Sequence, residues 1–124
     1  MKRKAIMRGD IYWIEFDSPI GKRPALIIQN NIGNEYAPTV IVATITSTPS
    51  GKSYPTDALL PNGTLSRKNS RILTATITTV DKDDLGQYIT SLSDEIMEDV
   101  DLALLVSLGL EKHTKMSEDS SDIE

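Results

Sequence analysis

Short runs of β-branched and aromatic residues, separated by turn-forming residues, fill most of the first 80 residues of this 124-residue chain. Such runs favour strands, because branched and aromatic side chains fit a pleated surface. We expect strands over 9–16, 24–28, 39–46, 54–60, 70–80 and 88–91. Between two of these runs, the pair Asn62-Gly63 favours the positive φ angles of a tight hairpin turn. The pattern predicts a small, strongly curved sheet or barrel of about five to seven short strands.

The last third of the chain changes to a helical period. Ile96 and Val100 lie on one face of a helical pattern, and Ser93 before it can cap the first turn through its hydroxyl. Gly109 suits the left-handed position just past a helix end. We therefore expect one helix over about 94–108. Its apolar stripe is wider than a single line of contact with the core requires. Either core packing alone buries the stripe, or a second contact, to a partner or across a dimer, covers part of it.

The composition predicts one domain. With 39% hydrophobic residues, a chain of this length can bury a real core. We expect that domain over 1–110 and a disordered acidic tail over 111–124, because few apolar residues there could offset the entropy of ordering. No apolar run approaches the roughly 18 residues of a membrane span, and no apolar segment of a signal peptide follows the basic start. We expect no membrane contact.

Missing residue types exclude several kinds of active site. The chain has no cysteine, which excludes disulfides, thiolate nucleophiles and Cys-ligated zinc, and it fits a reducing, cytoplasmic location. The one histidine, His113, lies in the polar tail. Paired-histidine acid–base chemistry and histidine metal clusters are therefore excluded as well.

Charge is divided unevenly along the chain. Residues 1–80 carry ten Lys and Arg against five Asp and Glu, whereas 81–124 carry three against thirteen. The net charge of −5 and the pI of about 4.8 would argue against a nucleic-acid partner. A basic face can still attract a polyanion locally, because the Debye length is only about 8 Å at physiological salt. The alternative is that both halves are ordinary solvated surface.

Two polar segments beside turns are the first candidates for chemistry. Pro24 keeps Arg23 extended, so its planar guanidinium is presented from a stiff strand edge and suits a phosphate, together with Lys22. The alternative is a structural pair between Arg23 and Asp17. The hydroxyls of the neighbouring pair Thr46-Ser47 can donate to a phosphate or a ribose, although threonine in strands more often reflects β propensity.

A second basic group surrounds a later turn. It consists of Arg67, Lys68 and Arg71, and we interpret it as a patch that contacts a nucleic-acid backbone. Four aromatic residues offer stacking faces for bases if they are exposed: Tyr12, Trp13, Phe16 and Tyr54. In a chain with only 5% aromatic residues, most of them should instead lie in the core.

Three segments in this order and spacing resemble the MazF/PemK/Kid toxin family: 8–13, 23–30 and 38–46. Shorter matches at 54–56, 79–82 and 92–93 and the terminal helix extend the resemblance over 8–110. It implies a mainly β fold, a small SH3-like barrel of the MazF/CcdB kind with a C-terminal helix, usually as a homodimer. It also implies a sequence-specific, ribosome-independent endoribonuclease toxin that cuts single-stranded mRNA, without metal or cofactor. A MazE-like antitoxin would place an acidic segment in the RNA groove.

The family resemblance assigns roles to individual residues. Arg23 matches the family's catalytic arginine and Thr46 its catalytic threonine, whereas Asp57 is only a candidate general base and water is the alternative. The RNA 2′-hydroxyl would attack the adjacent phosphorus, leaving a 2′,3′-cyclic phosphate and a 5′-hydroxyl. The residues expected to bind RNA are Lys22, Ser47, Thr56, Arg67, Lys68 and Arg71.

Two segments depart from the family pattern. Six residues separate Phe16 from Arg23, where relatives carry a longer Gly-rich insertion, and 75–78 reads Ala-Thr-Ile-Thr where many relatives read Glu-Gln-Ile-Arg. Two other functions therefore remain open. The chain could be a nuclease-inactive member that binds RNA or protein, or a CcdB-like gyrase poison that acts through apolar contacts of its terminal helix.

Overall fold

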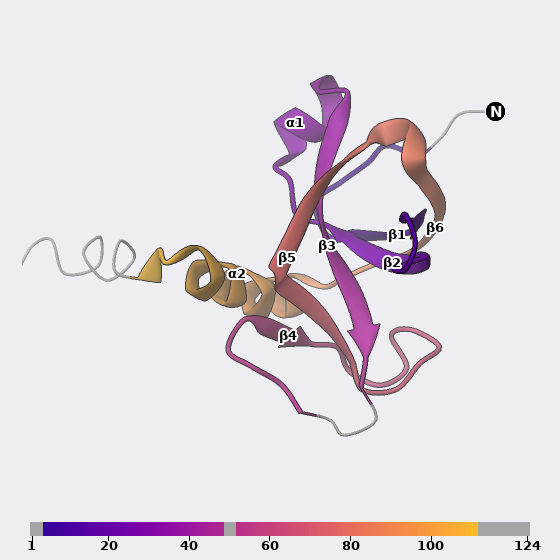
Figure 1. The fold of residues 1–124 in the computed structure, drawn as a ribbon. Coiled ribbons are helices and arrows are strands. Elements are labelled where there is room, and N and C mark those ends of the chain that lie inside the picture. Colours follow the sequence, from indigo (N-terminus) through magenta and orange to yellow (C-terminus); the bar gives the residue numbers. More distant parts are fainter. Residues whose placement is uncertain (1–3, 49–51, 112–124) are drawn as a thin grey trace, which may run out of the picture.

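The computed structural model describes residues 4–48 and 52–111. In chain order its elements are β1 (Asp10–Glu15), β2 (Lys22–Ile27), α1 (Asn31–Tyr36), β3 (Thr39–Ser47), β4 (Asp57–Leu59), β5 (Ser70–Asp81), the 3-10 turn η1 (Lys82–Asp84), β6 (Leu85–Ser91) and α2 (Asp94–Leu108). The strands form one antiparallel sheet in the order β4-β5-β3-β2-β1-β6, with α2 packed beside β4 and β5 (Figure 1).

The predicted fold class, mainly β with a C-terminal helix, is confirmed, but the expected closure into a barrel is not found among the described residues. The terminal strand β4 has three residues and pairs only with β5, while β6 at the other end pairs only with β1. Shifts of register between β1 and β6 and between β3 and β5 mark bulges, which bend strands and increase their twist. The sheet is therefore curved but open.

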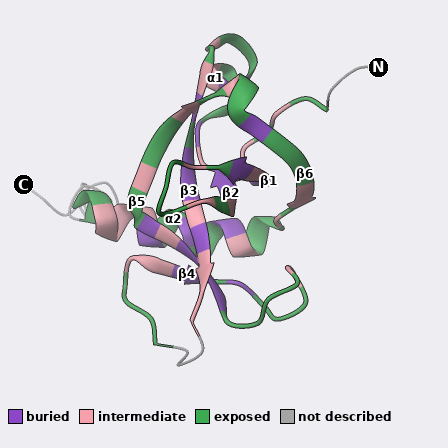
Figure 2. Ribbon diagram, turned by 45° about the vertical axis from the view of Figure 1, so that its right-hand side comes forward, coloured by how far each residue is buried: buried purple, intermediate pink, exposed green. Residues whose placement is uncertain are grey.

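Both faces of the central strands are buried, which explains why these strands read as continuous apolar runs. Ile11, Leu26 and Ile45 lie in a cluster on the α2 side, while Tyr12 and Val42 lie in a second cluster on the other side. In Figure 2 the buried positions follow β3 and the side of α2 that faces the sheet. The first cluster fixes the helix against the sheet, and the second fills the curve of the sheet.

The helix α2 occupies the predicted range. Ser93 caps it by accepting from the N–H of Ile96, and Gly109 ends it at a φ of 72°. Met97, Val100 and Ala103 are its buried residues. Outside these buried positions Leu102 and Leu108 stay exposed, so core packing buries only part of the apolar stripe of the helix.

Helix α1 is the element that the sequence did not predict. Residues 29–34 are among the turn-forming residues between the strands expected over 24–28 and 39–46. The structure instead forms a short helix here, whose first turn is capped by the Asn30 side chain, which accepts from the N–H of Gly33. Gln29 and Asn34 are buried and hydrogen-bond to each other at 3.1 Å. The amide side chains that favoured a turn here satisfy one another inside the helix and its flanks.

The predicted tight turn at Asn62-Gly63 forms, but it does not join two strands directly as a hairpin turn would. The two residues do form the centre of a turn, in which the N–H of Thr64 donates to the carbonyl of Pro61 and Gly63 has a φ of 100°. This turn lies inside the longer connection 60–69 between β4 and β5. The predicted strand ranges 54–60 and 70–80 leave nearly the same connection between the two strands.

Two expectations concern the ends of the chain. The predicted disordered tail lies, from residue 112 onward, outside the described residues. No helix among residues 4–48 and 52–111 is long and apolar enough to cross a membrane.

Candidate functional site

The register of the sheet brings Arg23 and Thr46 together. Ala25 on β2 is paired with Thr44 on β3, and continuing that register by two residues places Arg23 opposite Thr46. The two side chains lie on the same face, and Nη1 of Arg23 donates to Oγ1 of Thr46 at 3.1 Å. The predicted alternative for Arg23 is not found: the ion pairs of the described residues are Lys4–Asp10, Arg8–Asp101 and Arg71–Asp57.

A groove of about 570 Å³ opens beside this pair. Five of the predicted site residues line it: Lys22, Arg23, Thr46, Ser47 and Arg67. The rest of its wall is largely apolar and includes Trp13, Leu65 and Ile89. Hydrogen-bond donors and cations thus share one groove with flat, apolar surface, which suits a ligand that has both anionic and aromatic parts.

Of the four aromatic residues that the sequence offered as stacking faces, Trp13 is the one that lines the groove. It is half-buried, and the Nζ atom of Lys22 lies 5.3 Å from the centroid of its ring. In a chain with only 5% aromatic residues, a tryptophan in a strand is expected in the core. Trp13 alternates along β1 with the buried residues Tyr12 and Ile14, so the sequence places its side chain on the opposite face of the strand. Only the fold shows that this face opens to a groove.

The structure separates the other predicted site residues from the groove lining. Thr56 and the exposed Lys68 lie outside it. Arg71 is 3% exposed and its Nη1 lies 3.5 Å from Oδ2 of Asp57, whose side chain is also buried. Asp57 also accepts from the N–H of Tyr54 at 3.0 Å. Arg71 is therefore not a surface cation, and Asp57 is engaged by two donors.

The two segments that depart from the family pattern have different relations to the groove. The short connection between β1 and β2 closes on a hydrogen bond from the N–H of Phe16 to the carbonyl of Gly21, and it places Ile20 in the groove wall. The segment 75–78 lies farther along β5 and contributes no lining residue. Its Thr76 hydroxyl contacts that of Thr44 at 3.4 Å on the exposed surface.

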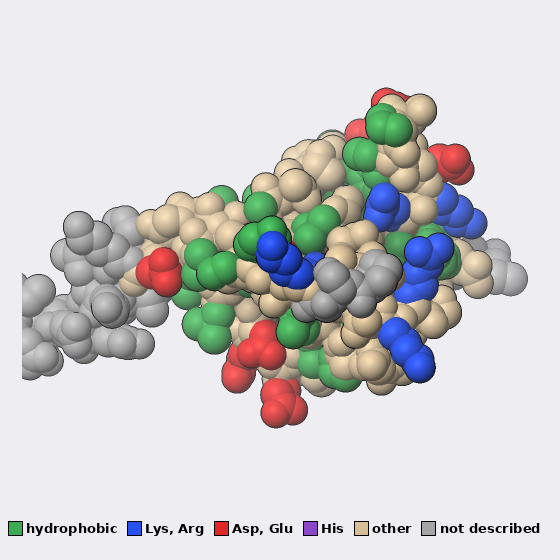
Figure 3. All heavy atoms as spheres, turned by 60° about the horizontal axis from the view of Figure 1, so that its bottom comes forward, with side chains coloured by type: hydrophobic (Ala, Val, Ile, Leu, Met, Phe, Trp, Pro, Cys, Tyr) green, Lys and Arg blue, Asp and Glu red, His purple; other side chains and the backbone are tan. Residues whose placement is uncertain are grey.

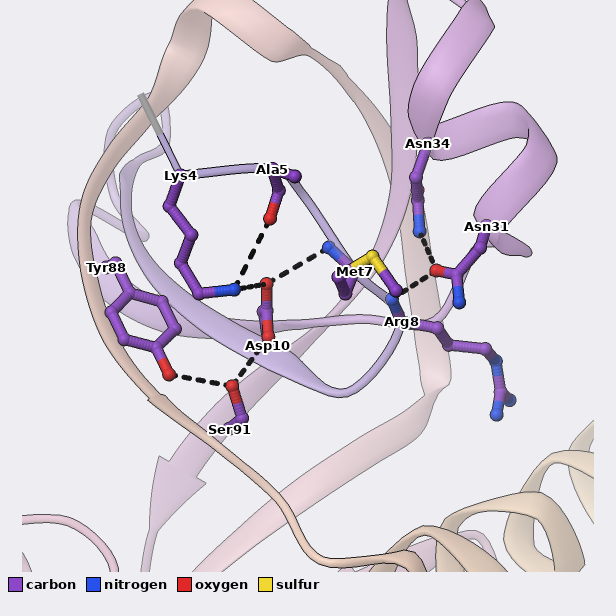
Figure 4. A network of polar contacts seen from close by, with 9 residues as sticks. All are labelled: Lys4, Ala5, Met7, Arg8, Asp10, Asn31, Asn34, Tyr88 and Ser91. Carbon is purple, nitrogen blue, oxygen red and sulfur yellow. Dashed lines mark hydrogen bonds and ion pairs between the residues drawn. The ribbon is translucent and has the colours of Figure 1, made fainter. Parts of the chain in front are cut away.

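A second polar cluster lies around Asp10, near the other end of β1 (Figure 4). The carboxylate is 2% exposed and accepts from Nζ of Lys4 and the N–H of Met7, both at 3.0 Å, and from the hydroxyl of Ser91 at 2.6 Å. Because Ser91 gives its proton to Asp10, the Tyr88 hydroxyl must donate to Ser91, at 2.7 Å. The hydrogen bond to Asp10 raises the pKa of Lys4 above its ordinary value of 10.5.

The charged residues of the described chain do not form a metal site. Among residues 4–48 and 52–111 there is no group of three or more Asp, Glu, His or Cys side chains that could hold a metal ion. On the face drawn in Figure 3, most Lys and Arg side chains gather on the right, whereas a group of Asp and Glu side chains lies at the lower left. Asp and Glu side chains also lie at the upper right of this face, and Arg8 of the basic part pairs with Asp101 of the acidic part, so the two kinds of charge are only partly separated.

Comparison with known proteins gives the family. The model of the "PemK-like, MazF-like toxin of type II toxin-antitoxin system" family matches residues 7–108. The chain is 40% identical over 111 residues to the protein named Endoribonuclease EndoA of Bacillus subtilis (strain 168), covering 85% of this chain and 96% of that protein.

Solved structures agree with this match. An endoribonuclease in complex with its cognate antitoxin, from Mycobacterial species, is 31% identical with a TM-score of 0.73, covering 86% of this chain and 97% of that chain. MazF in a MazE–MazF complex from Deinococcus radiodurans has a TM-score of 0.71 at 20% identity, covering 88% and 100% of the two chains, and shows the fold alone. The match over most of its length and its likeness to a named relative place this chain in the PemK-like, MazF-like family of toxins of type II toxin–antitoxin systems.

Proposed function

We propose that this protein is an endoribonuclease toxin that cuts single-stranded RNA in the groove beside Arg23 and Thr46. The observation that carries the proposal is the contact of 3.1 Å between Nη1 of Arg23 and Oγ1 of Thr46 in a groove that Trp13 also lines. Support for the reaction class comes from the relative at 40% identity, which is named an endoribonuclease.

The groove residues can perform RNA cleavage because the substrate supplies its own nucleophile. The ribose 2′-hydroxyl gives its proton to water and attacks the adjacent phosphorus. The P–O5′ bond breaks and the leaving 5′-oxygen takes up a proton from water, so the products are a 2′,3′-cyclic phosphate and a 5′-hydroxyl. Arg23 stabilises the charge that develops on the phosphorane oxygens, since a guanidinium stays protonated and its fork fits two of them. Thr46, held by Arg23, orients the scissile phosphate.

The remaining groove residues bind the strand on either side of the cut. Lys22 and Arg67 are exposed cations at the groove and contribute salt-dependent phosphate affinity. Trp13 offers a ring face on which one base stacks, a contact that every base can make. The hydroxyl of Ser47 lies beside Thr46 and can donate to a ribose or a phosphate.

The assembly in which this groove works is part of the proposal. The likeness to a solved endoribonuclease bound to its cognate antitoxin supports a MazE-like antitoxin as the partner that neutralises the activity. An acidic antitoxin segment would compete with RNA for the same cations. We further propose that the protein acts as a homodimer in the cytoplasm, where its mRNA substrate is found.

Mapping of cleavage ends tests the proposal. The purified protein is incubated with a mixed-sequence RNA in EDTA, and the 5′ ends are sequenced. We expect cuts at a short recurring sequence, new 5′-hydroxyl ends, and no cuts where the nucleotide before the bond carries a 2′-O-methyl group. Intact RNA would favour the nuclease-inactive alternative, and trapping of gyrase on DNA without RNA cleavage would favour the CcdB-like one.

A further inference from the structure

A row of polar side chains crosses four neighbouring strands at the end of the sheet that carries the groove. Continuing the β2–β3 register places Arg23 opposite Thr46, and Thr46 is in turn paired with Arg71 on β5. Directly opposite residues of antiparallel strands share a face, about 4.5–5.5 Å apart. Asp57 on β4 is paired with Leu73, so it lies diagonally across from Arg71, within reach of a long side chain.

The buried part of this row is poorly satisfied. Arg71 is 3% exposed, yet its Nε and Nη2 atoms have no hydrogen-bond partner among the described residues. Its one contact with Asp57 is a single, long one at 3.5 Å rather than a bidentate pair. Replacing such a buried pair by uncharged side chains is often neutral or stabilising, because the attraction barely offsets desolvation. Stability therefore does not account for the presence of the pair.

The position of the Arg71–Asp57 pair beside the groove explains its presence better than a contribution to stability does. The cation is carried by β5, the strand next to Thr46, whereas the carboxylate is carried by β4, one strand farther from the groove. Both side chains are at most 6% exposed, so solvent screens their field much less than that of a surface charge. A fixed cation at this position attracts an anion seated at Thr46, and it costs no reorganisation when the anion arrives.

We propose that Arg71 is a positioning residue of the groove. From the strand next to Thr46, its buried charge strengthens the binding of an RNA phosphate that it does not touch. Asp57 holds Arg71 in place and weakens the attraction that its charge exerts. The inference deepens the proposed function and rests on it. It replaces the expected roles of the two residues, since Arg71 is too buried to contact RNA from the surface, and Asp57 acts on Arg71 rather than as the general base.

The first experiment measures the affinity for a 2′-O-methyl RNA, which cannot be cut, in four proteins. Arg71→Met removes the cation, and we expect Kd to rise about tenfold. Asp57→Asn removes the opposing charge while its amide oxygen can still accept from Tyr54 and Arg71, and we expect Kd to fall several-fold. The double variant Asp57→Asn/Arg71→Met should lie between the parent and Arg71→Met. Opposite shifts from two neighbouring substitutions are not expected from loss of structure.

Three controls accompany this series. Arg8→Met makes the same substitution outside the groove, where Arg8 pairs with Asp101, and should change Kd less than about twofold. Thermal unfolding should show the double variant at least as stable as the parent. The ratio of Kd between Arg71→Met and the parent should persist at high salt, while the affinity of both proteins falls.

Cleavage kinetics separate positioning from catalysis. We expect KM to follow the order of Kd, with kcat within about threefold of the parent in all variants. A loss of about 100-fold or more in kcat for Asp57→Asn would make Asp57 the base and overturn the inference. So would weaker RNA binding by Asp57→Asn, or equal binding by all four proteins. A parent that binds RNA without cutting it contradicts the proposed function alone, and the affinity series still decides the role of Arg71.

Discussion

The two polar clusters of this sheet differ in how completely their hydrogen bonds are satisfied. Around Asp10, a carboxylate that is 2% exposed accepts from an ammonium, a backbone N–H and a hydroxyl. Arg23 instead gives one N–H to Thr46 and remains half-buried at the wall of the groove. A saturated cluster holds the fold together, whereas a cluster with donors left over at an open groove is arranged for a ligand.

Arg71 combines features of both clusters. It is as buried as Asp10, and like Arg23 it keeps unused donors. Burial alone therefore does not separate a structural polar residue from a functional one. Unsatisfied donors, rather than burial, distinguish Arg71 from Asp10.

The largest expected effect is on cleavage, from Arg23→Ala. Removing one preorganised charge stabiliser costs about 2.7–4 kcal/mol in the transition state, so we expect kcat to fall about 100- to 1000-fold. The melting temperature should stay near that of the parent, because Arg23 is not part of a saturated network. Arg8→Ala is the matched control and should keep parental kcat. Parental cleavage by Arg23→Ala would remove the groove from the proposed chemistry.

Asp10→Ala should show the opposite pattern. It leaves the donors of Met7, Ser91 and Lys4 without their shared acceptor, and we expect the free energy of unfolding to fall by about 2–3 kcal/mol. Chemical denaturation measures this loss. The folded fraction should cut RNA with parental kcat, since the network lies away from the groove. A protein of parental stability would show that the Asp10 cluster is dispensable.

Thr46→Val separates the role of the groove hydroxyl from that of a neighbouring threonine on the same strand. The substitution keeps the shape and the β propensity but deletes the hydroxyl that Arg23 contacts. We expect cleavage to fall about fivefold, equivalent to one net hydrogen bond of about 1 kcal/mol. Thr44→Val, two residues earlier on β3, is the control and should cut normally. Equal losses in the two variants would mean that both threonines serve the strand rather than the substrate.

The smallest expected effect is the pH dependence of the Lys4–Asp10 pair. The pKa of Lys4 is raised in the folded protein by its bond to Asp10, so its contribution to stability is fully present below pH 10.5 and is lost as the pH rises beyond that value. Lys4 is 41% exposed, so we expect less than about 1 kcal/mol. The difference in unfolding free energy between the parent and Lys4→Met should shrink above pH 10.5. A difference that does not change with pH would contradict the ionic origin.

Local signals predicted the elements well. The helix was placed correctly because Ser93 and Gly109 mark its ends through local backbone chemistry. The central strands followed from β-branched runs that are buried on both faces. Helix α1 was not predicted, because the polar side chains of Gln29 and Asn34 hydrogen-bond to each other only once the helix has formed.

Local signals predicted the site less evenly. The resemblance singled out Arg23 and Thr46, and their roles in catalysis stay a prediction. Arg67 and Arg71 looked equivalent in sequence, yet one is exposed at the groove and the other is buried beside Asp57. A position that alternates along a strand determines which face a side chain takes, but the neighbouring strand determines what it meets there.

The sequence by itself determined where strands and helix form, which residue types are missing, and that one part of the chain is basic and the other acidic. Tertiary structure decided which cations share a groove, that Trp13 opens into it, and that Arg71 is buried on the strand next to Thr46 rather than exposed on the surface. The physical reason is the distance along the chain over which each interaction acts. Caps, turns and periodicity act over a few residues, whereas Arg23, Thr46 and Arg71 are brought side by side only by the pairing of three strands.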